Sequence, residues 1–80
     1  MNKPRRKELG RIQEQLESLK ERLENLQEQE QEAYDNMPEG LQESERGEKA
    51  YQINDHLENA ISNLAECLDE IEEAIDEYES

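Results

Sequence analysis

The sequence predicts an all-α fold, an antiparallel two-helix hairpin packed as a coiled coil. Apolar residues recur at alternating spacings of three and four in both halves of the chain, and a segment with proline and glycine separates the halves. Hydrophobic residues make up 31% of the 80 residues and charged residues 40%. Disordered chains and coiled coils share such a composition, and the sustained period favours the coiled coil.

The first helix is expected over residues 4–35. Pro4 suits the first helical turn, where its missing N–H group would have no helical partner. Continued forward, the period places Glu30, Ala33 and Met37 in core positions, so Glu30 interrupts the apolar stripe. The stripe itself has the alternating spacing of heptad core positions and consists of Leu9, Ile12, Leu16, Leu19, Leu23 and Leu26.

A turn is expected over residues 36–42. Asn36 can end a helix. Pro38 disfavours the helical conformation at Met37. We therefore expect the chain to reverse its direction between the two stripes.

The second helix is expected over residues 43–78. Ser44 is a suitable N-cap, because its hydroxyl can accept a hydrogen bond from a free backbone N–H group. Gly47 occupies the position where a capping box would have Glu or Gln. A glycine inside the helix would let Tyr34 or Met37 of the first helix approach closely.

The second helix has a wider apolar stripe than the first, with three rows instead of two. The middle row has small side chains, which would let the first helix approach closely. Alternatively, alanine occurs there simply because it is a good helix former. The rows are Leu57, Leu64 and Ile71, then Ala60, Cys67 and Ala74, then Ile61, Leu68 and Ile75.

The charge distribution favours antiparallel packing. Most basic residues precede residue 12, none follows Lys49, and the C-terminal stretch is acidic. Each cluster lies at the unfavourable end of its own helix dipole, and antiparallel packing brings the two clusters together. We expect Leu26 near Ile53, and Leu9 near residues 67–71.

The hairpin is expected to leave an apolar strip uncovered. Because the second helix has one apolar row more than the first, Ile61, Leu68 and Ile75 would remain partly exposed. Two helices also make a thin core. Homodimerisation into a four-helix bundle, or docking on another protein, would cover the strip.

No motif of enzyme, cofactor or metal chemistry is found. Glycine-rich phosphate loops, paired cysteines and His-Glu-x-x-His are missing. A di-iron motif would need Glu three residues before His56, where Ile53 stands. A calcium loop beginning at Asp35 would have Met37 in a ligand position. We interpret Cys67 as a small apolar residue, and expect no enzyme and no cofactor.

The net charge of -14 is the feature most able to carry function. It either solubilises the helices or forms rows of carboxylates that imitate a nucleic-acid backbone and attract a basic protein. The expected binding residues are carboxylates of both helices together with the uncovered strip. They are Glu14, Glu17, Glu21, Glu24, Glu28, Asp55, Glu58, Asp69, Glu72 and Asp76, with Ile61, Leu68 and Ile75.

The same composition disfavours nucleic acid and membrane as direct partners. Basic residues form only a short patch from Lys3 to Arg11, too small for a nucleic-acid groove. No apolar run is long enough to span a membrane, and the basic start leads into no apolar signal segment. We therefore expect a cytoplasmic protein.

The junction between the helices resembles that of a known group of proteins. The segment from Asp35 to Lys49, with Met37-Pro38 and Ser44 inside it, resembles the helix junction of small acidic proteins of phages and mobile elements of Gram-positive bacteria. Gly40 departs from the resemblance, where Ser is expected. The resemblance implies a helical hairpin in a bacterial cytoplasm. By analogy it also implies binding or inhibition of a host protein of defence or nucleic-acid machinery.

The sequence thus favours a non-enzymatic protein-binding protein of phage or mobile-element origin that engages a host protein through acidic helix faces. The alternative is a structural or adaptor coiled coil whose acidity serves only solubility.

Overall fold

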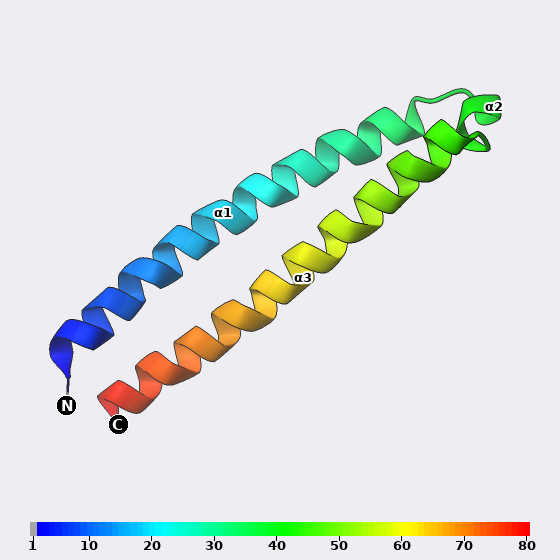
Figure 1. Cartoon of the computed structure of the whole chain (residues 1–80). Helices are drawn as coiled ribbons and strands as arrows, with labels where there is room; N and C mark the ends of the chain where they lie inside the picture. Colours follow the sequence, from blue (N-terminus) through cyan, green and yellow to red (C-terminus); the bar gives the residue numbers. More distant parts are fainter. Residues whose placement is uncertain (1) are drawn as a thin grey trace.

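Two long antiparallel helices form a rod in which the start of the first helix lies beside the end of the second (Figure 1). The structure is a computed structural model that describes residues 2–80. Helix α1 spans Lys3–Asp35, the single turn α2 spans Glu39–Gln42, and α3 spans Glu45–Glu79. The rod measures 60 × 15 × 13 Å. The predicted all-α fold is confirmed, and the two helices fit the predicted hairpin.

Local sequence sets both ends of α1. The side-chain oxygen of Asn2 accepts a hydrogen bond from the Arg5 N–H group at 3.1 Å, and Pro4 lies in the first turn, as predicted. Asn36 is the C-cap, and Pro38 follows two residues later. The end of the helix at residue 35 agrees with the sequence prediction.

The predicted turn over 36–42 contains one turn of helix, α2. Its backbone N–H groups at Leu41 and Gln42 donate to the Pro38 carbonyl at 2.9 and 3.1 Å. The side-chain amide of Gln42 donates to the Tyr34 carbonyl at 3.0 Å. This bond ties α2 to the end of α1.

The start of α3 packs against α2. Ser44 is the predicted N-cap, and its hydroxyl accepts a hydrogen bond from the Gly47 N–H group at 3.4 Å. Gly47 is buried, and a Cβ atom there would collide with the carbonyl oxygens of Leu41 and Gln42. The close neighbour of Gly47 is therefore α2, and the sequence-based expectation that it would be α1 is wrong.

Two contacts fix the register of α1 against α3. Arg6 forms an ion pair with Glu79 at the open end of the hairpin. Near the junction the rings of Tyr34 and Tyr51 have their centroids 6.3 Å apart. The two helices remain paired between these contacts (Figure 1).

The predicted register is shifted by about two helical turns. The sequence placed Leu26 beside Ile53, whereas Leu26 and Leu64 line the same groove in the structure. The shift has a physical cause, because α2 covers the first turn of α3. Pairing of α3 with α1 therefore begins only near Tyr51.

One of the two predicted core rows of α1 faces α3. Leu9, Leu16 and Leu23 are half-buried, as expected. Ile12, Leu19 and Leu26, predicted for the core, are 38, 46 and 47% exposed. The second half-buried row is instead mostly polar and consists of Arg6, Gln13, Lys20, Gln27 and Tyr34.

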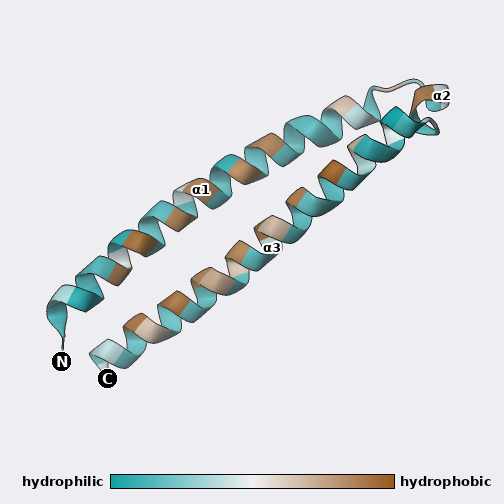
Figure 2. Cartoon of the chain, in the orientation of Figure 1, coloured by the Kyte–Doolittle hydropathy of each residue, from teal (hydrophilic) through white to brown (hydrophobic). Residues whose placement is uncertain are grey.

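On α3, two rows of large side chains face α1 and the small row lies beside them. In the small row Cys67 is exposed, whereas Ala60 and Ala74 are half-buried like the large side chains, so the expectation that the small row faces α1 is not confirmed along its length. Figure 2 shows hydrophobic residues (brown) recurring between hydrophilic ones (teal) along the length of both helices. The rows in the seam are half-buried or buried and consist of Leu57, Leu64 and Ile71, with Asn54, Ile61, Leu68 and Ile75.

The seam between the helices is incompletely closed. No hydrophobic side chain in residues 2–80 is buried. Asn54 is 5% exposed, and neither its amide nitrogen nor its carbonyl oxygen has a hydrogen-bond partner in this part of the chain. The contact between the two helices therefore buries the apolar side chains only in part.

Candidate protein-interaction site

One long side of the rod is an acidic face. It consists of the rows on one side of the seam. On α1 these rows lie beside the row of Gln27, and on α3 they lie beside the row of Ile61. Among the described residues, these rows contain two basic residues, Lys3 and Lys7, both in the first two turns of α1. The carboxylates of the acidic face are all exposed, and they are Glu14, Glu17, Glu21, Glu24, Glu28, Asp35, Glu48, Asp55, Glu58, Asp69, Glu72, Asp76 and Glu79.

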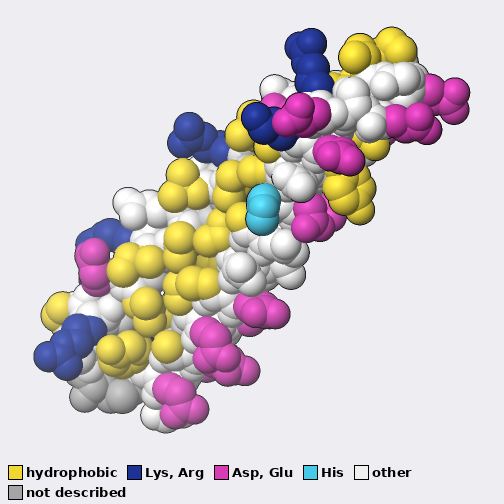
Figure 3. Space-filling model, turned by 45° about the vertical axis from the view of Figure 1, so that its right-hand side comes forward, with side chains coloured by type: hydrophobic (Ala, Val, Ile, Leu, Met, Phe, Trp, Pro, Cys, Tyr) yellow, Lys and Arg dark blue, Asp and Glu magenta, His cyan; other side chains and the backbone are white. Residues whose placement is uncertain are grey.

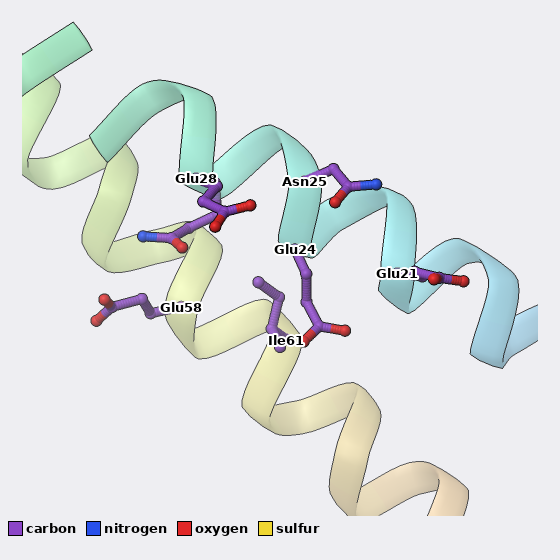
Figure 4. Close-up of a pocket in the computed structure, with 7 residues that line it drawn as sticks. Glu21, Glu24, Asn25, Glu28, Glu58 and Ile61 are labelled. Atoms are coloured by element: carbon purple, nitrogen blue, oxygen red, sulfur yellow. The ribbon is translucent and has the colours of Figure 1, made fainter. Parts of the chain in front are cut away.

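A shallow groove crosses the middle of the acidic face. Its volume is about 540 Å³. Figure 4 shows Glu24 and Glu28 of α1 together with Glu58 and Ile61 of α3 around this groove. The groove thus brings carboxylates of both helices to one place, with an apolar side chain between them.

The acidic face is little compensated by basic side chains. Lys20 lies 3.3 Å from the carboxylate of Glu24, and Arg6 pairs with Glu79. The other carboxylates of this face make no ion pair within residues 2–80. Exposed charges are screened over about 8 Å at physiological salt, so the rows act on a partner at short range.

The structure gathers the acidic residues that the sequence singled out. All ten predicted carboxylates are exposed and lie in the rows of the acidic face. The predicted apolar strip has a different environment, because Ile61, Leu68 and Ile75 are half-buried in the seam against α1. Ile61 reaches the edge of the acidic groove.

The opposite side of the rod is an apolar face that the sequence did not predict. Leu16, Leu19, Leu23, Leu26 and Leu64 line a groove of about 630 Å³ there. A continuous apolar band runs along this side, with Lys and Arg mostly on one margin and Asp and Glu mostly on the other (Figure 3). Beyond the seam, the apolar face consists of Ile12, Leu19, Leu26 and Ala33 on α1 and Ile53, Ala60, Cys67 and Ala74 on α3.

The signal for the apolar face was present in the sequence as surplus apolar rows. The sequence shows one surplus row, on the second helix; only the packing shows that the Ile12 row of α1 is also left outside the seam, on the same side of the rod. Ile53 is 47% exposed and continues the row of Ala60.

The described residues contain neither a cluster of metal-binding side chains nor a membrane-spanning helix. Within residues 2–80, no group of three or more His, Cys, Asp or Glu side chains is arranged to hold a metal ion. None of the helices in that range combines the length and apolar character that crossing a membrane requires.

No protein-family model, curated protein sequence or solved structure matches this chain. The fold is that of an all-α, coiled-coil-like hairpin. Its two unlike faces are therefore the basis for any functional conclusion.

Proposed function

We propose that this chain is a non-enzymatic protein-binding protein that engages a basic partner through its acidic face. The observation that carries the proposal is the gathering of carboxylates from both helices around the groove of Glu24, Glu28 and Glu58. Because Lys3 and Lys7 at the start of α1 are the basic residues of these rows in the described chain, the rest of the face has a strong negative field that attracts and orients a basic surface.

The proposed partner is a host protein that handles nucleic acid. Rows of carboxylates along a rod resemble the charges of a nucleic-acid backbone, so they can occupy a groove that normally holds DNA or RNA. The junction segment from Asp35 to Lys49 supports a phage or mobile-element origin by resemblance. In that setting the protein acts in the bacterial cytoplasm and inhibits defence or nucleic-acid machinery. Neither nucleic acid nor membrane is a direct partner in this proposal.

Self-association forms part of the same proposal. The seam buries no hydrophobic side chain in residues 2–80, and Leu19 and Leu26 are nearly half exposed. A homodimer would cover them. This observation also favours the second candidate function, a structural or adaptor coiled coil whose acidity serves only solubility.

A capture experiment distinguishes the two functions. The full chain is immobilised and exposed to nuclease-treated lysate of a Gram-positive host, beside a variant that changes Glu21, Glu24, Glu28 and Glu58 to Gln. The matched control changes Glu39, Glu43, Glu45 and Glu66, which lie outside the acidic face, to Gln. Both variants lose four negative charges, so only position differs.

The proposal predicts a partner that is retained by the wild type and the control and lost from the acidic-face variant. Salt and double-stranded DNA should both displace it, because many charges act together. A partner that is indifferent to salt and DNA, and is lost on changing the exposed Leu19 or Leu26 to Glu, would instead establish the adaptor function.

A further inference from the structure

We propose that the apolar face is the docking site for a second copy of this chain, which completes a four-helix bundle with both helix junctions at the same end. The inference names the surface and the geometry of the self-association proposed above. It rests on that part of the proposed function and is independent of the partner of the acidic face.

The direction of the apolar stripes supports a second copy. On α1 the stripe is centred between the row of Leu16 and the row of Leu19, about 50° away from the centre of the seam. In a two-helix coiled coil the stripe would be centred on the seam. In both helices the apolar stripe is displaced from the seam toward the same side of the hairpin. This displacement is typical of a four-helix bundle, in which the apolar stripe of each helix faces the bundle axis.

The side-chain sizes of the two outer rows are complementary. The register that pairs Arg6 with Glu79 and Tyr34 with Tyr51 also fixes which outer residues lie at the same level. At each level a large side chain on one helix matches a small one on the other. The matched pairs are Ile12 with Ala74, Leu19 with Cys67, Leu26 with Ala60, and Ala33 with Ile53.

This complementarity selects one orientation of the second copy. A twofold axis parallel to the rod places α1 of one copy beside α3 of the other at the same level, so each large residue meets a small one. A twofold axis across the rod would place Leu19 beside Leu26 of the second copy and Ala60 beside Cys67. In such an interface the large side chains between the two α1 helices would clash, and the small side chains between the two α3 helices would leave a gap.

The charges select the same orientation. Because the acidic face lies on the other side of the rod, the copies meet with little repulsion. The axis across the rod would bring Arg22 close to Arg22 of the second copy. The axis along the rod instead brings Arg5, Arg11 and Arg22 of one copy near the levels of Glu77, Glu73 and Glu66 of the other.

The size of the face is sufficient for a stable dimer. With extents of 60 and 15 Å, the long side of the rod, which carries the apolar face and its charged margins, covers roughly 900 Å², on the scale of the ~800 Å² that each partner contributes to a standard interface. The dimer would carry its two acidic faces outward on opposite sides. It could therefore bind two basic sites at once, with the gain in avidity that this brings.

Disulfide cross-linking tests the orientation in the full chain. The native Cys67 is combined with Leu19→Cys in one variant and with Ala60→Cys in a matched variant. Positions 60 and 67 lie two turns apart on one helix, too far for a bridge within the chain. After mild oxidation, Leu19→Cys should give at least tenfold more covalent dimer than Ala60→Cys or the wild type. The reverse ratio would overturn the orientation.

Sedimentation equilibrium tests the surface itself. Leu26→Glu adds a charge to the apolar face outside the seam, and Ala65→Glu adds the same charge beside the acidic face. Leu26→Glu should raise the dimer dissociation constant at least tenfold, while Ala65→Glu leaves it unchanged. Circular dichroism on the same samples checks that both variants remain helical. Equal effects of the two substitutions, or a monomeric wild type at high micromolar concentration, would contradict the proposal.

Discussion

The ring of Tyr34 in the last turn of α1 lies 6.3 Å from the ring of Tyr51 in α3, with the two planes tilted by 60°. This pair marks the level at which α1 and α3 begin to pack, one turn beyond the contact between α2 and α3. It therefore contributes to the register of the whole hairpin, although Tyr51 is 62% exposed.

Replacing Tyr51 by Ala should lower the free energy of unfolding by about 1 kcal/mol, the scale of an aromatic pair. Tyr51→Phe keeps the ring and should retain the wild-type value. Denaturant unfolding followed by circular dichroism measures both. If Tyr51→Ala unfolds at the wild-type denaturant concentration, the ring pair does not hold the junction.

The junction depends more strongly on Gly47. A Cβ atom at this position would overlap the carbonyl groups of Leu41 and Gln42, so Gly47→Ala should destabilise the protein by about 1–3 kcal/mol. Gly10 is the matched control, since a Cβ atom there meets nothing within 4 Å.

Gly10→Ala should stabilise the protein by up to about 1 kcal/mol, because alanine is the better helix former. Thermal unfolding of the two variants side by side measures the difference. A Gly47→Ala protein as stable as the wild type would show that α2 does not pack on Gly47.

Asn54 is a buried polar residue whose side chain has no hydrogen-bond partner in residues 2–80. Asn54→Leu should therefore raise the free energy of unfolding by about 1–3 kcal/mol, the cost of burying such a group. The exposed Asn59 gives the control, and Asn59→Leu should stay within about 0.5 kcal/mol of the wild type. A less stable Asn54→Leu protein would mean that the amide is satisfied in solution.

The carboxylates of the acidic face should repel one another. Raising the salt from 0.1 M to 1 M shortens the screening length from about 10 Å to about 3 Å. The melting temperature should rise by about 4–8 °C, which corresponds to ~1 kcal/mol for a chain of this size. The variant with Gln at positions 21, 24, 28 and 58 should rise less. A melting temperature that falls with salt would show that ion pairs such as Arg6 with Glu79 outweigh the repulsion.

The ends of the helices were predictable because local chemistry decides them. Pro4, Asn36 and Ser44 act through their own backbone and side-chain groups, and the structure places them in the roles that the sequence indicated. The acidic set was predictable for a similar reason. A regular period separates Glu21 and Glu28 from the apolar rows whatever the register is.

The register and the apolar face were not predictable in this way. Each depends on how α2 packs over Gly47, a contact between segments that the period of either helix does not encode. The row of Ile12 and the row of Gln13 both lie next to the Leu9 row. The apolar row looked like the core, but tertiary packing turned the polar row toward α3.

The central claim is that a second copy covers the apolar face along the length of the rod. Small-angle X-ray scattering over a concentration series tests it most directly. The forward scattering should reach twice the mass of the 9.5 kDa chain, while the longest dimension stays near the 60 Å extent of one hairpin. The mass of a single chain at every concentration would contradict the claim, and so would a dimer that is much longer than one rod.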